Sequence, residues 1–181
     1  LKGINLNLPA GNFVSLVGES GCGKSTIAGI LAAKNRGYNG EITIGGVPLN
    51  EVREENLMQK VILVRHNSYL FKGTVEENLK MAKPDATKEE MEEVLQKVNL
   101  LGFLQTQDGL QTQLLEKASN LSGGQCQRLV IARALLRTES AVYIFDEAAS
   151  NIDVESEELI MNVIHELAKT KTVLLISHRL A

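Results

Sequence analysis

The chain has 181 residues, of which 44% are hydrophobic and 23% are charged, and its formal net charge is -3. This length suggests one domain that can bury a sizeable core, with room for an inserted subdomain. The slightly acidic balance excludes the basic surface expected of a nucleic-acid-binding protein, and no apolar run approaches the ~20 residues that span a bilayer. The two cysteines fit no disulfide or metal pattern and no secretory signal is visible, so we expect a reduced, cytosolic environment.

Hydrophobic periodicity predicts alternating strands and helices in the first third of the chain. Residues 4–8 and 13–17 read as strands, and residues 25–34 read as a helix. A short strand is expected over residues 41–44, before a Gly-Gly turn. A continuous apolar run over residues 61–64 is typical of a strand that is covered on both faces.

The middle of the chain, from about residue 74 to 136, changes to a helical pattern. Thr87 and Glu90 have the spacing of a capping box that opens a helix toward Val98. Ser122 is placed to cap the next helix.

Strands return over residues 141–145 and 172–176. The helix predicted between them has an apolar face formed by Leu159, Ile160, Val163, Ile164 and Leu167. The alternation predicts an α/β fold, with the helical stretch as an inserted subdomain.

A glycine-rich loop separates the second strand from the first helix. It reads G-E-S-G-C-G-K-S-T and consists of Gly18, Glu19, Ser20, Gly21, Cys22, Gly23, Lys24, Ser25 and Thr26. The spacing is that of a Walker A loop in its strand–loop–helix context, which predicts binding of ATP. Backbone N–H groups and the helix N-terminus would bind the phosphates, with Lys24 on the β- and γ-phosphates and Thr26 as a further donor. The Ser25 hydroxyl is predicted to be a ligand of Mg²⁺.

An apolar strand that ends in two acidic residues predicts the metal and water end of the same site. Asp146 at the strand tip is expected to hold Mg²⁺ through water. Glu147, the next residue, is expected to act on the attacking water as a general base. His178 follows the last predicted strand, where the ligands of such sheets bind, which favours a γ-phosphate contact over a plain surface histidine.

A second short motif lies about a hundred residues after the Walker A loop and consists of Leu121, Ser122, Gly123, Gly124 and Gln125. With it, the chain resembles the nucleotide-binding domain of ABC transporters over essentially all 181 residues. Residues 150–153 are similar to the D-loop of that family, and His178 corresponds to its switch histidine.

The resemblance implies a P-loop NTPase core, with a mostly parallel sheet and an antiparallel β edge, and an inserted α-helical subdomain. We expect one domain over residues 1–181, truncated at both ends. Within it, residues 1–66 and 137–181 would form the core, and about 67–136 the helical subdomain.

The resemblance also implies a Mg²⁺-dependent ATPase that works as a head-to-tail pair. ATP would lie between the Walker A loop of one domain and residues 121–125 of the other, with Asp153 at the seam. The second domain could be identical or different. Three segments resemble the corresponding segments of exporters: residues 70–79, residues 109–116 and the Ser-His-Arg-Leu-Ala end. In exporters, a transmembrane domain is usually fused to the ATPase domain. The expected location is the cytoplasmic face of a membrane, with this piece itself soluble and no nucleic-acid partner.

The sequence departs from the family pattern at three places. His66 stands where the Q-loop glutamine is expected, unless Asn67 takes that role, and imidazole is a softer ligand than Mg²⁺ prefers. Residues 115–118 read Leu-Glu-Lys-Ala, where Gly-Glu-Arg-Gly is common. The adenine-stacking aromatic residue would lie upstream of Leu1, so we expect weakened ATP binding.

Two alternatives to a transport motor remain at the level of sequence. One is a regulatory module that dimerises on ATP but hydrolyses it weakly because of His66; Glu147 and His178 argue against it. The other is an ABC ATPase of DNA repair or translation, which the absence of sustained heptads and of a basic surface disfavours.

Overall fold

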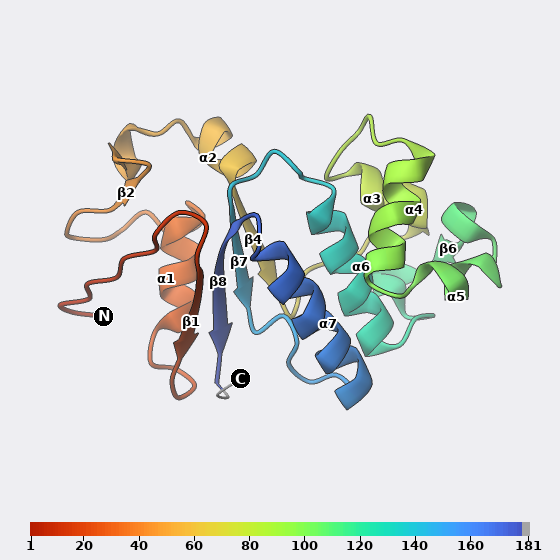
Figure 1. The fold of residues 1–181 in the computed structure, drawn as a ribbon. Coiled ribbons are helices and arrows are strands. Elements are labelled where there is room, and N and C mark those ends of the chain that lie inside the picture. The colour runs from red at the N-terminus through yellow and green to blue at the C-terminus, as the bar shows by residue number, and fades with distance from the viewer. Residues whose placement is uncertain (179–181) are drawn as a thin grey trace. The chain divides into compact units, whose positions relative to one another are not determined.

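The computed structural model describes residues 1–178, so the Arg-Leu-Ala end of the exporter-like segment lies outside the described residues. The chain divides into two compact units (Figure 1). The first contains Leu1–Leu63, Glu139–Glu147 and the described part of Ala168–Ala181. The second contains Val64–Thr138 and Ala148–Leu167.

The first unit is built on a sheet with the strand order β1 (Phe13–Val17), β8 (Thr172–Ser177), β7 (Val142–Asp146) and β4 (Val61–Arg65). Strand β8 pairs in parallel with both β1 and β7, and the four strand arrows run the same way in Figure 1. The predicted α/β fold with a parallel sheet is therefore confirmed. Residues 172–176 of the central strand β8 are all buried, as expected of a strand whose two faces are both covered.

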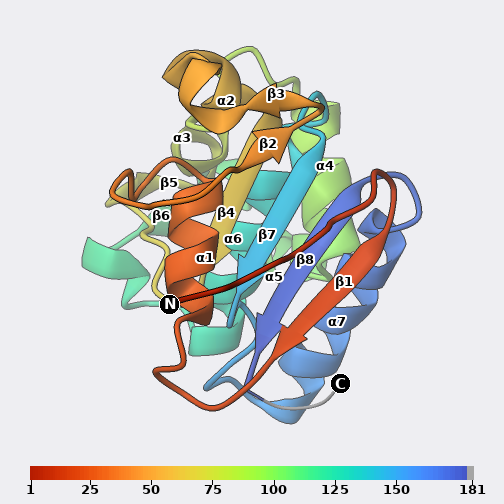
Figure 2. The same ribbon diagram turned by 90° about the vertical axis from the view of Figure 1, so that its left-hand side faces the viewer.

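Helix α1 (Lys24–Leu31) lies against this sheet (Figure 2). Their shared core contains Ala28 from the helix and Ile144 and Leu174 from the strands. The helix ends earlier than the periodicity predicts, because Ala33 adopts a positive φ of 58° and the Lys34 N–H donates to Gly29 O at 2.7 Å.

A short hairpin forms the antiparallel part of the first unit. Strands β2 (Thr43–Ile44) and β3 (Val47–Pro48) pair around Gly45 and Gly46, whose φ angles of 60° and 79° suit a two-residue turn. The strand is shorter than the one expected from residue 41. A 3₁₀ turn (Leu49–Glu51) and helix α2 (Glu54–Lys60) follow.

The strand predicted over residues 4–8 is wrong. Alternation of apolar residues selects a strand-like pattern, but a strand also requires a hydrogen-bonded neighbour, and none pairs with this segment among the described residues. Leu8 packs on the core of the first unit, whereas Ile4 and Leu6 are 54% and 41% exposed.

The second unit is mainly helical. Its helices are α3 (Val75–Lys80), α4 (Lys88–Lys97), α5 (Leu101–Gln105), α6 (Gly123–Leu135) and α7 (Val154–Leu167), with 3₁₀ turns at Gly109–Gln111 and Glu116–Ala118. Strands β5 (Gly73–Thr74) and β6 (Gln113–Leu114) form a small antiparallel ladder. The buried helix α6 contacts α3, α4 and α7, so it organises the packing of this unit.

Reciprocal capping boxes open three of these helices. In each box, the N-cap hydroxyl accepts from the N3 amide, and the N3 side chain accepts from the N-cap amide. The three pairs are Thr74 with Glu77, Thr87 with Glu90, and Ser122 with Gln125. The capping box predicted at Thr87 and the cap predicted at Ser122 are thus confirmed.

The boundaries predicted from sequence between core and helical subdomain stay a prediction. Contacts assign residues 148–167 to the helical unit, whereas the sequence placed them in the core. Within residues 1–178, no helix combines the length and the apolar character needed to cross a bilayer.

Candidate functional site

The loop between β1 and α1 leaves the N-terminus of α1 open to an anion. Gly23 is the N-cap residue, with φ 102°, which favours glycine. In the part of the chain that the structure describes, no side chain caps this helix. The amides of its first turn therefore point into the loop, where the helix dipole favours a phosphate.

The Lys24 ammonium is held inside the same loop. Its Nζ donates to Gly18 O at 2.6 Å and to Glu19 O at 2.7 Å, and it lies 3.6 Å from Cys22 Sγ. Only 6% of Lys24 is exposed. The two carbonyls fix a full positive charge beside the helix N-terminus, so the loop combines a charge with backbone donors.

Ser25 and Asp146 form the metal end of this site. Ser25 Oγ donates to Asp146 Oδ1 at 3.0 Å, and Asp146 is 4% exposed at the end of β7. A hydroxyl and a carboxylate are hard oxygen ligands, which suits Mg²⁺ with water molecules in its remaining positions. The donor set therefore fits the predicted metal, and Ser25 and Asp146 are the residues that would hold it.

Glu147 turns the chain sharply at the end of β7. Its φ is 53°, a left-handed conformation that is unusual for a residue with a side chain, and its N–H donates to Ile176 O at 2.9 Å. The Glu147 Oε1 atom lies 3.7 Å from His178 Nδ1. Backbone strain of this kind often accompanies a functional position, where the neighbouring structure fixes an otherwise unfavourable geometry.

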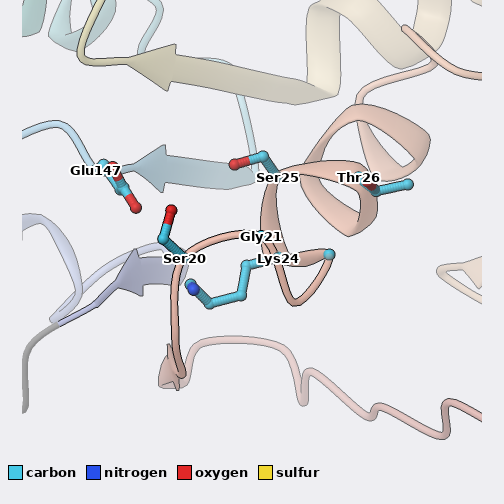
Figure 3. Close-up of a pocket in the computed structure, with 7 residues that line it drawn as sticks. Ser20, Gly21, Lys24, Ser25, Thr26 and Glu147 are labelled. Atoms are coloured by element: carbon cyan, nitrogen blue, oxygen red, sulfur yellow. The ribbon is translucent and has the colours of Figure 1, made fainter. Parts of the chain in front are cut away.

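A pocket of about 250 Å³ joins the loop to Glu147 (Figure 3). Its lining residues are Ser20, Gly21, Gly23, Lys24, Ser25, Thr26 and Glu147. In the close-up, the Glu147 carboxylate points toward Ser20, whereas the Thr26 side chain extends on the far side of the helix.

All of these lining residues were predicted from sequence. The other predicted residues of this group surround the pocket: the Gly18 and Glu19 carbonyls and Cys22 hold Lys24, Asp146 holds Ser25, and His178 neighbours Glu147.

The second predicted motif lies in the helical unit. Leu121 is half-buried before α6, and Ser122 is its N-cap residue. Ser122 Oγ accepts from Gln125 N at 3.1 Å, and Gln125 Oε1 accepts from Ser122 N at 2.9 Å. The hydroxyl proton of Ser122 is not used in this box. The start of α6 is therefore a second helix N-terminus suited to an anion, with Gly123 exposed and Gly124 buried.

Asp153 and His66 are the remaining predicted positions, and both belong to the helical unit. Asp153 Oδ2 accepts from Ser156 N at 2.8 Å at the start of α7. The bonds from Ser156 hold the pKa of Asp153 below its ordinary value. His66 lies in an exposed turn after β4, next to Asn67, so its role as the Q-loop residue stays a prediction.

The known proteins with similar sequences include an ABC transporter ATP-binding protein, a lipid A-core flippase and a multidrug resistance protein. A family model described as ABC transporter matches residues 1–150. An uncharacterized ABC transporter ATP-binding protein of Haemophilus influenzae is 49% identical over the whole chain, which covers 32% of that protein. The ATP-dependent lipid A-core flippase of Escherichia coli is 43% identical, with all of this chain and 31% of the flippase covered. Multidrug resistance protein pgp-1 of Caenorhabditis elegans is 40% identical, with all of this chain and 14% of that protein covered.

A solved structure shows the same fold. The chain matches a bacterial Atm1-family ABC exporter with ATP bound, with a TM-score of 0.90 and 31% identity. The match covers 98% of this chain and 31% of the exporter chain. The chain thus spans a third or less of the length of these relatives.

Proposed function

This chain belongs to the ABC transporter family, and we propose that it is the ATP-hydrolysing motor domain of an exporter-type transporter. The observation that carries the proposal is the pocket in which the Walker A loop and Glu147 face one another. A phosphate-binding loop alone would support nucleotide binding. A carboxylate across the same pocket adds a group that can act on water beside the γ-phosphate.

Each residue of the first unit has a distinct role in this proposal. The α1 amides and Lys24 bind the β- and γ-phosphates, and Lys24 is oriented by two loop carbonyls. Ser25 and Asp146 would hold Mg²⁺, and the bound ion would offset negative charge on the phosphates. Glu147 accepts a proton from the attacking water, and His178, 3.7 Å from its carboxylate, contacts the γ-phosphate.

Two copies are required in this proposal. The Walker A pocket lies in one unit, and the capped start of α6 supplies a second set of amides in the other. ATP would join the pocket of one copy to the Ser122–Gly124 segment of the other, arranged head to tail. We propose a transmembrane domain as the further partner, consistent with the full-length lipid A-core flippase and the Atm1-family exporter among the relatives.

The test is Mg²⁺-ATP turnover measured over a range of protein concentrations, for the parent chain and for Glu147→Gln. We expect turnover of the parent to rise faster than linearly with concentration, because two copies form each site. Glu147→Gln should retain ATP binding and lose turnover by about 10²-fold or more, the contribution of a general base.

Two outcomes would overturn the proposal. The first is tight ATP binding without turnover at any concentration of the parent chain. The second is an unchanged rate in Glu147→Gln. A Glu139→Gln variant is a matched control, because Glu139 lies in the same unit but does not line the pocket. It should behave like the parent.

A further inference from the structure

Gly124 is packed so closely that no side chain fits at its position. A methyl group on its Cα would lie 2.7 Å from Asp153 Oδ1 and 2.8 Å from Ser156 Cβ, and it would collide with Ser156 Oγ. Real Cβ atoms do not approach other atoms this closely. The first turn of α6 and the first turn of α7 are therefore in direct backbone-to-side-chain contact.

The adjacent glycine provides an internal contrast. Apart from its own helix backbone and chain neighbours, a methyl group on Gly123 would meet no atom of residues 1–178 within 4 Å. The two glycines of the motif thus serve different purposes in the helical unit. Gly123 leaves an exposed surface, whereas Gly124 allows a close approach to α7.

Ser156 is suited to hold this contact in place. It is 5% exposed, and its N–H donates to Asp153 Oδ2 at 2.8 Å. The Asp153 side chain therefore caps α7 by accepting from the Ser156 N–H. The side chains of Asp153 and Ser156 both lie directly against Gly124. At the other side of the turn, the Ser122–Gln125 capping box fixes the same end of α6. The helix start is held from two directions.

We infer that Ser156 is a positioning residue for the motif at residues 121–125, which it holds against the D-loop residue Asp153. This inference rests on the proposed function, because it assigns the motif to ATP bound by a second copy. Ser156 touches neither ATP nor metal in this scheme. It fixes the position and direction of the amides at the start of α6. These amides then form a preformed anion site for the γ-phosphate of the ATP bound by the second copy.

The experiment combines substitutions that create and remove the clash. Gly124→Ala should lower Mg²⁺-ATP turnover by about tenfold, because overpacking must displace the start of α6. Ser156→Gly in the Gly124→Ala background should recover part of that loss. It removes the close contacts with Ser156 Oγ and Cβ, leaves the one with Asp153 Oδ1, and keeps the N–H that donates to Asp153.

Gly123→Ala is the matched control. It places the same methyl group one residue away, where Ser156 is not among the neighbours within 4 Å. Ser156→Gly should therefore not rescue any loss of turnover that Gly123→Ala causes. The same pairs are compared by urea unfolding, in which Gly124 and Ser156 should be coupled and Gly123 and Ser156 should not. Gly102→Ala, also without neighbours within 4 Å, controls for the general effect of alanine in a helix.

The outcomes separate this inference from the proposed function. If Gly124→Ala has parent turnover, or if Ser156→Gly rescues neither variant or both equally, the positioning role is wrong. Coupling in unfolding without coupling in turnover would reduce the contact to a packing role and would also overturn the inference. If the parent itself has no turnover, the proposed function fails, while the unfolding cycle still decides whether the Gly124–Ser156 contact exists.

Discussion

The Ser25 hydroxyl donates to the Asp146 carboxylate at 3.0 Å, although 121 residues separate them in the sequence. Ser25 belongs to the first turn of α1 and Asp146 to the end of β7. The bond joins the phosphate-binding loop to the acidic strand end. It brings together a hydroxyl and a carboxylate oxygen, the two groups that we propose as Mg²⁺ ligands.

Asp146→Asn should weaken Mg²⁺ use while sparing the loop. The amide keeps the shape and can still accept from Ser25, but it removes the negative charge that favours a divalent cation. We expect the Mg²⁺ concentration for half-maximal turnover to rise by about tenfold or more. Nucleotide binding without Mg²⁺, followed by fluorescence, should change little. Equal loss of binding with and without Mg²⁺ would contradict this assignment.

Alanine usually gives a more stable protein than glycine, but the left-handed backbone at Glu147 predicts the opposite order of stability at this position. Alanine at this position keeps the steric cost of φ 53°, whereas glycine removes it. Both substitutions should abolish turnover. Glu147→Gly should nevertheless be more stable to urea than Glu147→Ala by about 1 kcal/mol. The opposite order would show that the backbone relaxes when the carboxylate is lost.

The two cysteines should react with thiol reagents at different rates. Cys22 is exposed in the Walker A loop, whereas Cys126 is half-buried on α6, and burial raises the pKa of its thiol. The thiolate is the reactive form, so Cys126 should need a higher pH and longer exposure. A bulky maleimide on Cys22 should block ATP binding, and bound ATP should protect it.

A Cys22→Ser variant provides the control for this labelling. It retains Cys126 alone, so maleimide treatment should leave ATP binding intact. Mass spectrometry after limited reaction identifies the modified residue. Full ATP binding after confirmed modification of Cys22 would rule out its position at the phosphate site.

The capping box at the start of α4 predicts a pH-dependent contribution to stability. Glu90 accepts from Lys83 Nζ at 2.5 Å and from Thr87 N at 2.9 Å. The hydrogen bond from Lys83 contributes most, and the one from Thr87 less, to holding the pKa of Glu90 below its ordinary value. A carboxylate whose pKa is lower in the folded than in the unfolded state adds to the free energy of unfolding at pH values above its ordinary pKa. This contribution is lost as the pH falls through the lowered pKa. Glu90→Gln should therefore lower the free energy of unfolding near neutral pH, and the difference from the parent should vanish in acid.

Urea unfolding across the acidic range measures this effect. Glu93→Gln is the comparison, because it removes an exposed ion pair with Lys97 outside any capping box and should change stability much less. A constant difference between parent and Glu90→Gln at all pH values would contradict ionisation as the cause.

Substitution at His66 tests the unusual Q-loop position. An amide oxygen is a harder ligand than imidazole, so His66→Gln should lower the Mg²⁺ concentration needed for half-maximal turnover. Asn67→Gln is the matched variant in the same exposed turn. An effect at Asn67 instead of His66 would shift the Q-loop assignment by one residue.

The sequence brought together the residues that line the pocket more accurately than it predicted the ends of the helices and strands. The Walker A residues and Glu147 could be identified because phosphate chemistry demands particular residue types at fixed spacings. The α/β fold followed from the alternation of strands and helices, and the mostly parallel sheet was implied by the family resemblance. The segment over residues 4–8 shows the limit of this reading: its alternation is strand-like, but pairing depends on residues distant in the sequence.

The contact between Gly124 and Ser156 was also beyond the reach of the sequence. The family motif already accounts for a glycine at position 124. Nothing in the sequence around Ser156 indicates that this serine contacts another helix. The close approach exists only because α6 and α7 pack together in the helical unit. Such contacts between helix ends require coordinates.

The position of β8 has a consequence for how the protein is made. This strand follows both β1 and β7 in the sequence, yet it lies between them and pairs with both. Until it has left the ribosome, β1 and β7 cannot be joined, and each presents an open edge that can pair with other chains. Because the Walker A loop follows β1 and Glu147 follows β7, the two sides of the pocket should come together only after β8 has been synthesised. A nascent chain that stalls before residue 172 would be both inactive and prone to aggregate.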